Sequence, residues 1–429
     1  MRLLKKVLDK GVFYNILSLL SVFLGFVFIV LLGREFGAAK ETDIYFLSVV
    51  VINYLGYFVQ SVWEAFTPYY AEIKIKDKSR SDRLFSILLN YLVISALFLI
   101  SLYYLIGDAF SVSFLNSDLK SFLNVFIFYL LFQNILFLNK TILNLERFYA
   151  SFYVVDIFVF SVNIITVLFF VKESVLIIAY STILSTLLAN LWQFYLIFKK
   201  MNMRYYPSFY MEEIKEILQN SFKLKLGSFF IGIKDIVIAS VLTSFGSGVY
   251  SLYSYANKFL GVILQIINAP VVNIFAAKAT HLIAKNRLKK SLALMKGVLS
   301  KTTIFYVVSI VFTYYMIPFI IKLLFSQKFT FENIITIQRI FFIMSFYYLC
   351  TVFYSPVGRV LTILKKFNFL LVADFVFMAV LLILVKTVAF DTIDMLLYFL
   401  ILAHTVFTFV IFFYFIGLIN NLKRVCSYA

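Results

Sequence analysis

The sequence predicts an all-α protein that crosses a membrane about twelve times. Of its 429 residues, 63% are hydrophobic and only 14% are charged, and the mean hydropathy is +0.96. A soluble domain of ordinary composition has about a quarter charged residues, so this chain lacks the polar surface that water requires. The apolar segments are too long, and too apolar on every face, for the alternating strands of a transmembrane barrel. Helices are the remaining way to pair the backbone inside a bilayer.

Twelve windows meet the length of about 20 residues that a helical span of the bilayer requires. They are 13–33, 44–67, 84–106, 121–143, 150–171, 174–198, 222–246, 249–275, 302–324, 334–356, 369–390 and 395–418. The first follows basic residues, as a secretory signal does, but it ends at Gly33-Arg34 without a small-residue cleavage site. We therefore expect the first window to remain as an uncleaved helix.

The 39 lysines and arginines are concentrated at every second boundary between these windows. The basic boundaries include the N-terminus, 74–83, 199–215, 278–301 and the C-terminal pair Lys423-Arg424. By the positive-inside rule these boundaries are cytoplasmic, and both termini are expected there. Because the net charge of +18 is distributed in this way, it indicates membrane topology rather than nucleic-acid binding.

The polar connection near the centre divides the chain into two predicted halves of six helices each. We expect a first bundle over 1–200, a cytoplasmic linker over 201–221 and a second bundle over 222–429. The linker contains Pro207 and the amphipathic run 211–218, which predicts a short interfacial helix. Phe36-Gly37 and Phe245-Gly246 close the first outer boundary of each half, which suggests a parallel repeat.

Signatures of an enzyme are missing from the sequence. His281 and His404 lie far apart without a carboxylate at metal-ligand spacing, and no glycine-rich phosphate loop occurs. Cys350 falls within a span and Cys426 in the tail, so no disulfide framework is expected. We expect no enzymatic activity and no cofactor. If the protein moves a solute uphill, the energy comes from the membrane potential or from a gradient of H⁺, Na⁺ or the substrate.

Three ionisable residues lie deep within predicted spans. Lys234 and Asp235 are about 18 Å into their helix, near the bilayer midplane, and Lys258 is nearly 14 Å deep from the outer side. An intramembrane charge costs about 2.5–3.5 kcal/mol, so each should face a partner or a cavity. Either lysine could form an internal ion pair with Asp235. Alternatively, the lysines line a water-filled cavity that receives an anionic substrate, and the two arrangements are compatible.

Weaker candidates accompany these charges. Gln60 and Glu64 lie one turn apart and could line the same cavity, although Glu64 could equally cap the helix at the interface. The helix dipole explains Asp156, which is near the start of a helix. Asparagines within spans are expected to hydrogen-bond between helices. This group comprises Asn53, Asn163, Asn190 and Asn268.

Three stretches of sequence resemble the lipid II flippases. They are Leu31–Asp43 with Phe66-Thr67-Pro68, then Tyr253–Lys258, then Ile321–Thr330 with Gln338-Arg339. These flippases belong to the superfamily of multidrug, oligosaccharidyl-lipid and polysaccharide exporters. The resemblance implies two six-helix bundles that form a V around a central cavity, alternating access, and the bacterial cytoplasmic (inner) membrane. It also implies an undecaprenyl-diphosphate-linked oligosaccharide as substrate, beside membrane lipids and, as further partners, a glycan polymerase or glycosyltransferases.

The chain also departs from the lipid II flippases. Where that family carries arginines in its first two helices, this chain has Val22, Phe28 and Gly56, and Lys258 matches the arginine of the eighth helix. Twelve helices are fewer than that family has, which favours the flippases of polysaccharide repeat units. We therefore expect a flippase for either a repeat unit or a lipid II-like precursor. Its substrate site comprises Lys258, Lys234, Asp235, Asn257, Gln60 and Glu64. The alternatives are a drug/cation antiporter of the superfamily and a membrane glycan polymerase or ligase.

Overall fold

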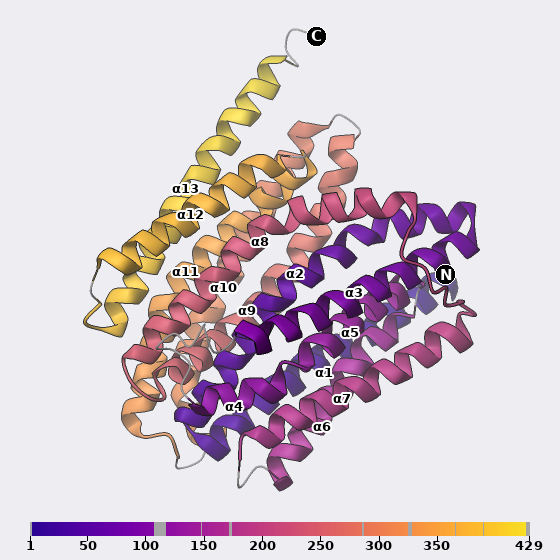
Figure 1. Ribbon diagram of the computed structural model, residues 1–429. Helices are drawn as coiled ribbons and strands as arrows, with labels where there is room; N and C mark the ends of the chain where they lie inside the picture. Colours follow the sequence, from indigo (N-terminus) through magenta and orange to yellow (C-terminus); the bar gives the residue numbers. More distant parts are fainter. Residues whose placement is uncertain are drawn as a thin grey trace. The chain divides into compact units, whose positions relative to one another are not determined.

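The computed structural model describes the backbone of residues 2–106, 117–146, 148–170, 174–284, 287–324, 328–364, 366–388 and 390–425. Some side chains inside these ranges lie outside the description, among them those of 57–68. Helices occupy almost all of the described residues, which include no strand (Figure 1). The predicted all-helical fold is confirmed.

Most of each predicted window lies in a helix or, in one case, in a bent pair of helices. The helices that precede the central connection are α1 (Arg2–Phe36), α2 (Lys40–Lys76), α3 (Lys78–Ile106), α4 (Ser117–Phe126), α5 (Tyr129–Leu145), α6 (Tyr149–Phe170) and α7 (Leu176–Tyr195) with the π-helical turn η2 (Leu196–Lys200). Those that follow are α8 (Glu212–Ser244), α9 (Val249–Ala284), α10 (Leu288–Leu324), α11 (Phe331–Ile363), α12 (Phe367–Thr387) and α13 (Ile393–Val425).

Within the described residues, 8 helices are long and apolar enough to cross a membrane, and the pair α4–α5, bent by 40°, makes up to 9. The other windows lie in α2, α8 and α9, which are 37, 33 and 36 residues long. At a rise of about 1.5 Å per residue, each of these three helices is also longer than the bilayer is thick.

The helices form two compact units, Met1–Gly232 (unit 1) and Ile233–Ala429 (unit 2). In unit 1, α1 packs on α6, α6 on α7, and α2 on α3 and α5. A core at one end of this unit joins α2, α3, α5 and η2 to the first turns of α8. In unit 2, α11 packs against α9, α10 and α13, and α12 packs against α13.

The run 211–218 does not form a separate short helix in the linker. Residues 212–218 form the first turns of α8, which continues without a break to Ser244. Met211, Ile214 and Ile217 recur at helical spacing and are buried in the core of unit 1. Because this apolar face is covered by protein, the segment packs as part of the bundle, as amphipathic helices in a globular core do.

Each of the two Phe-Gly pairs places a glycine with positive φ just after a helix. Gly37 follows α1 with φ of 71°, and Gly246 follows α8 with φ of 128°. Glycine adopts positive φ without the steric cost that a Cβ brings, which is why glycine commonly ends a helix. After Gly37, the Thr42 hydroxyl donates to the Gly37 carbonyl and accepts from the Ala39 amide at 3.1 Å, which fixes the start of α2.

Candidate functional site

The structure pairs Lys234, rather than Lys258, with Asp235. In unit 2 the Lys234 ammonium lies 3.3 Å from the Asp235 carboxylate and donates a hydrogen bond of 3.0 Å to the Tyr347 hydroxyl on α11. It also lies 5.1 Å from the centre of the Tyr347 ring. The Lys234 side chain is 14% exposed and that of Asp235 is 47% exposed. Lys234 is therefore held inside unit 2 by three interactions.

Aromatic and polar side chains surround this lysine within unit 2. The Tyr347 ring stacks on His404 of α13 with centroids 4.2 Å apart, and His404 Nε2 lies 3.3 Å from the Thr351 hydroxyl. Tyr253 of α9 lies near Lys234 and is hydrogen-bonded to the side chain of Asn257. Tyr347 and His404 were not predicted to belong to the site, because helical periodicity does not reveal which helices meet.

Lys258 differs from Lys234 in its surroundings. It lies ten residues into α9, which begins at Val249, and its side chain is exposed although its neighbours Ala256, Phe259 and Leu260 are buried. Among the described residues, no acidic side chain forms an ion pair with it. Asn257 precedes it and keeps a buried Oδ1 without a described hydrogen-bond partner. Within the described part of the chain, Lys258 is therefore an exposed cation in a predicted span without an acidic partner, and it lies beside a buried amide oxygen without a described donor.

The remaining site candidates are in α2. Gln60 and Glu64 lie within this helix, but their side chains are outside the described residues. Their contribution to the site stays a prediction.

Other intramembrane polar groups have structural partners. Asp156 lies beyond the first turn of α6, where the helix dipole is weak, and it forms an ion pair with the buried Lys140 of α5. The Lys140 ammonium also lies 4.9 Å from the centre of the Phe152 ring. Asn163 accepts hydrogen bonds from Ser181 at 2.8 Å and Thr182 at 3.3 Å, which join α6 to α7. The expectation of interhelical asparagine contacts is confirmed for Asn163.

Comparison with known proteins identifies the family. The model of the lipid II flippase MurJ family matches residues 32–361, which is most of the chain. This chain belongs to the MurJ family. A probable lipid II flippase MurJ from Buchnera aphidicola subsp. Baizongia pistaciae (strain Bp) is 24% identical over 353 residues, covering 77% of this chain and 67% of the relative. The protein is therefore a multi-pass membrane transporter and not an enzyme.

Solved structures agree with this fold. The inward closed conformation of lipid II flippase MurJ has a TM-score of 0.78 and 18% identity, covering 95% of this chain and 87% of that chain. An inward-facing multidrug resistance MATE transporter of the MOP superfamily has a TM-score of 0.76 and 15% identity, covering 95% of each chain. At such identities the likeness to solved structures shows the fold alone, whereas the match to the MurJ family model rests on the sequence.

The MurJ match corrects one inference from the sequence. The count of twelve helices and the missing arginines favoured a repeat-unit flippase, but the chain belongs to the lipid II flippase family despite them. At one of these positions the structure shows a packing role. Phe28 is 2% exposed, and its ring meets Tyr45 of α2 edge-on with centroids 5.8 Å apart. An aromatic contact between α1 and α2 therefore occupies the place where the resemblance leads us to expect a cation.

Proposed function

We propose that this MurJ family member moves an undecaprenyl-diphosphate-linked cell-wall precursor of the lipid II class from the cytoplasmic to the outer leaflet of a bacterial inner membrane. The family membership supports the class of substrate. The observation that carries the binding site is the exposed Lys258 without a described acidic partner. Access to the two leaflets would alternate through relative movement of the two units, as in other transporters built from two bundles.

The chemistry of the diphosphate suits this site. An anionic headgroup cannot cross hydrocarbon without charge compensation, and a lysine within a span is itself unfavourable unless it meets an anion or water. Lys258 and a phosphate oxygen would each reduce the desolvation penalty of the other. Asn257 Oδ1 adds an acceptor for a sugar hydroxyl or an amide N–H. Lys234 is already engaged by Asp235 and Tyr347, so we assign it to the support of unit 2.

Orientation and energy source complete the proposal. The basic boundaries place both termini in the cytoplasm by the positive-inside rule. The membrane potential supplies about 2.3 kcal/mol per charge per 100 mV, so net charge movement could drive the cycle, with H⁺ or Na⁺ as alternative coupling ions. The enzymes that would work with it are the glycosyltransferases that build the precursor and the polymerases that consume it.

The test is transport of fluorescent lipid II in proteoliposomes under an imposed membrane potential, read as dye that becomes accessible to an external quencher. Lys258→Ala should lower the initial rate roughly tenfold or more, because one charge-assisted hydrogen bond is lost. Lys258→Arg should retain most of the rate. Lys301→Ala, which removes an exposed charge of α10 outside the site, is the matched control.

Wild-type transport by Lys258→Ala, at equal protein incorporation, would contradict the role of Lys258. A second arm replaces lipid II with an undecaprenyl-diphosphate oligosaccharide that lacks the peptide. If only this compound is moved, the lipid II class is wrong although the protein remains a flippase.

A further inference from the structure

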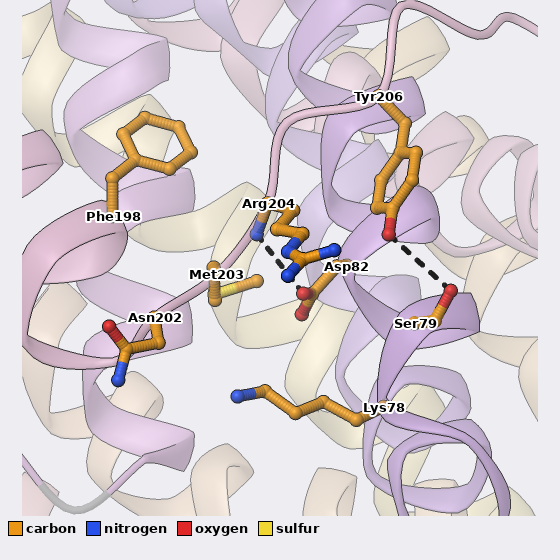
Figure 2. Close-up of a pocket in the computed structure, with 8 residues that line it drawn as sticks. All are labelled: Lys78, Ser79, Asp82, Phe198, Asn202, Met203, Arg204 and Tyr206. Atoms are coloured by element: carbon orange, nitrogen blue, oxygen red, sulfur yellow. Dashed lines mark hydrogen bonds between the residues drawn. The ribbon is translucent and has the colours of Figure 1, made fainter.

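A cavity of about 600 Å³ lies in unit 1, where α3 begins and the chain leaves η2 (Figure 2). Its lining combines residues from α3 and η2 with residues of the connection that follows them. They are Lys78, Ser79 and Asp82 of α3, Phe198 of η2, and Asn202, Met203, Arg204 and Tyr206 of the connection. A volume of this size is in the usual range of small-molecule sites.

The residues beside the cavity indicate that it lies at the level of lipid headgroups. In α3 the charged first turn gives way to apolar residues from Leu84 onward. In η2 the sequence changes in the opposite direction, because Phe198 is followed by Lys199 and Lys200. Both elements therefore cross from hydrocarbon to water beside the cavity, and the positive-inside rule assigns this side to the cytoplasmic leaflet.

Asp82, on the buried side of the cavity, lacks a hydrogen-bond donor for one of its two oxygens among the described residues. Asp82 is 4% exposed, and its Oδ2 accepts from the Arg204 amide at 3.1 Å. Its Oδ1 is buried and has no hydrogen-bond partner among the described residues. The nearby Lys74 is engaged in an ion pair with Glu146. A buried carboxylate oxygen without a donor is unfavourable, so a ligand that brings a donor to Asp82 would bind more tightly.

The rim of the cavity offers positive charge. Lys78 and Arg204 are both exposed, and Lys78 extends toward the segment of Asn202, where it donates to the Met201 carbonyl at 3.4 Å (Figure 2). Neither cation forms an ion pair with a described acidic residue. On the other side, the hydroxyls of Ser79 and Tyr206 are 3.5 Å apart. Exposed cations at the rim and a buried acid on the floor of the cavity would complement a ligand that carries both a negative and a positive charge.

We propose that this cavity binds the headgroup of a phospholipid with a primary ammonium beside its phosphate, the phosphatidylethanolamine class. The phosphate would lie between Lys78 and Arg204, and the ammonium would donate to Asp82 Oδ1. A quaternary ammonium has no N–H to donate, and a purely anionic headgroup would leave Asp82 Oδ1 without a hydrogen-bond donor. The headgroup chemistry therefore distinguishes this site from a general attraction of basic residues to lipid.

The cavity wall is held in place by a row of contacts along α3. The Ser86 hydroxyl accepts from the backbone amide of Tyr206 at 3.1 Å, and the side-chain amide of Asn90 donates to the Ser208 carbonyl at 3.0 Å. The Tyr91 hydroxyl donates to the Phe209 carbonyl at 3.1 Å. Because the connection is fixed to α3, the two rim cations come from preorganised segments, and a bound headgroup would join these segments further.

The test is native mass spectrometry of the purified, delipidated protein titrated with short-chain phosphatidylethanolamine, its N-methyl and N,N-dimethyl derivatives, phosphatidylcholine and phosphatidylglycerol. Affinity should fall along the methylation series, roughly tenfold from the primary to the quaternary ammonium, for loss of a charge-assisted hydrogen bond. Asp82→Asn, which keeps an acceptor for the Arg204 amide, should remove the preference. Lys78→Ala with Arg204→Ala should weaken every headgroup.

Lys200→Ala is the matched control, because it removes an exposed neighbouring charge outside the cavity lining. The methylation series uses the wild-type protein, so the test does not depend on the folding of any variant. Equal affinity for the primary and quaternary ammonium would overturn the proposal. An effect of Lys200→Ala equal to that of the double variant of Lys78→Ala and Arg204→Ala would overturn it as well, since it would show attraction to basic charge alone. Soluble glycerophosphoethanolamine, titrated in parallel, distinguishes a free headgroup from the lipid.

Discussion

Lys234 and Tyr347 should be energetically coupled in the stability of unit 2. The Lys234 ammonium donates to the Tyr347 hydroxyl at 3.0 Å from a side chain that is only 14% exposed. A hydrogen bond to a charged group contributes about 1.5–3 kcal/mol in proteins, whereas hydrogen bonds between membrane helices average about 0.6 kcal/mol. Asp235 is 47% exposed, so its ion pair adds little. We expect a coupling of about 1–2 kcal/mol between Lys234 and Tyr347.

A double-mutant cycle measures this coupling. Lys234→Met, Tyr347→Phe and the double variant would be unfolded reversibly with SDS in mixed micelles. Phenylalanine keeps the stacking of position 347 on His404 and removes only the hydroxyl. Circular dichroism is the suitable probe, because both tryptophans, Trp63 and Trp192, lie in unit 1.

The control cycle combines Lys258→Met with Tyr347→Phe. It removes the same charge from a position with no described acidic partner, and its coupling should be near zero. A Lys234–Tyr347 coupling under about 0.5 kcal/mol, the usual limit of additivity, would refute the assignment of Lys234 to structure. Lys234 would then be available to the substrate beside Lys258.

Two further predictions concern unit 1. Lys140→Met should destabilise the protein by about 2–3 kcal/mol, because it leaves Asp156, only 29% exposed, without its cation. The double variant with Asp156→Asn should recover most of that loss in SDS unfolding followed by tryptophan fluorescence, and no recovery would contradict the ion pair. Asn90→Ala removes the hydrogen bond to the Ser208 carbonyl at 3.0 Å, so limited proteolysis should cleave residues 201–210 faster. Cleavage at the wild-type rate would show that this segment is held by its other contacts.

The helices and their ends were predictable because local rules govern them. A bilayer leaves the backbone no partner but itself, so apolar length alone predicted a helix at every window. Gly37 and Gly246 have positive φ, as expected of glycines that close a helix. Where the prediction differed, as for the short helix over 211–218, the reason was tertiary. Whether Ile214 and Ile217 face lipid or the core of unit 1 depends on which helices lie opposite them.

The candidate site was predictable only in part. Lys234, Asp235 and Lys258 stood out because charges within spans are rare and unfavourable. Their division of roles was not predictable, since either lysine could have met Asp235. The hydrogen bond to Tyr347, which is 113 residues away in the sequence, is one of the contacts that distinguish Lys234 from Lys258. The cavity at Asp82 was not predicted either, because the backbone amide that donates to Asp82 belongs to Arg204, which is 122 residues away in the sequence.

The sequence by itself determined that this chain is a helical membrane protein, which of its charges are deep in the bilayer, and which family it belongs to. These properties follow from composition, segment length and motifs, which are all local along the chain. The tertiary structure alone decided that Lys234 is engaged by Tyr347, that Lys258 is left without a described acidic partner, and that Asp82 lies on the floor of a cavity. Each of these depends on which distant helices pack together. The sequences of apolar helices of nearly uniform composition give little indication of which helices they contact.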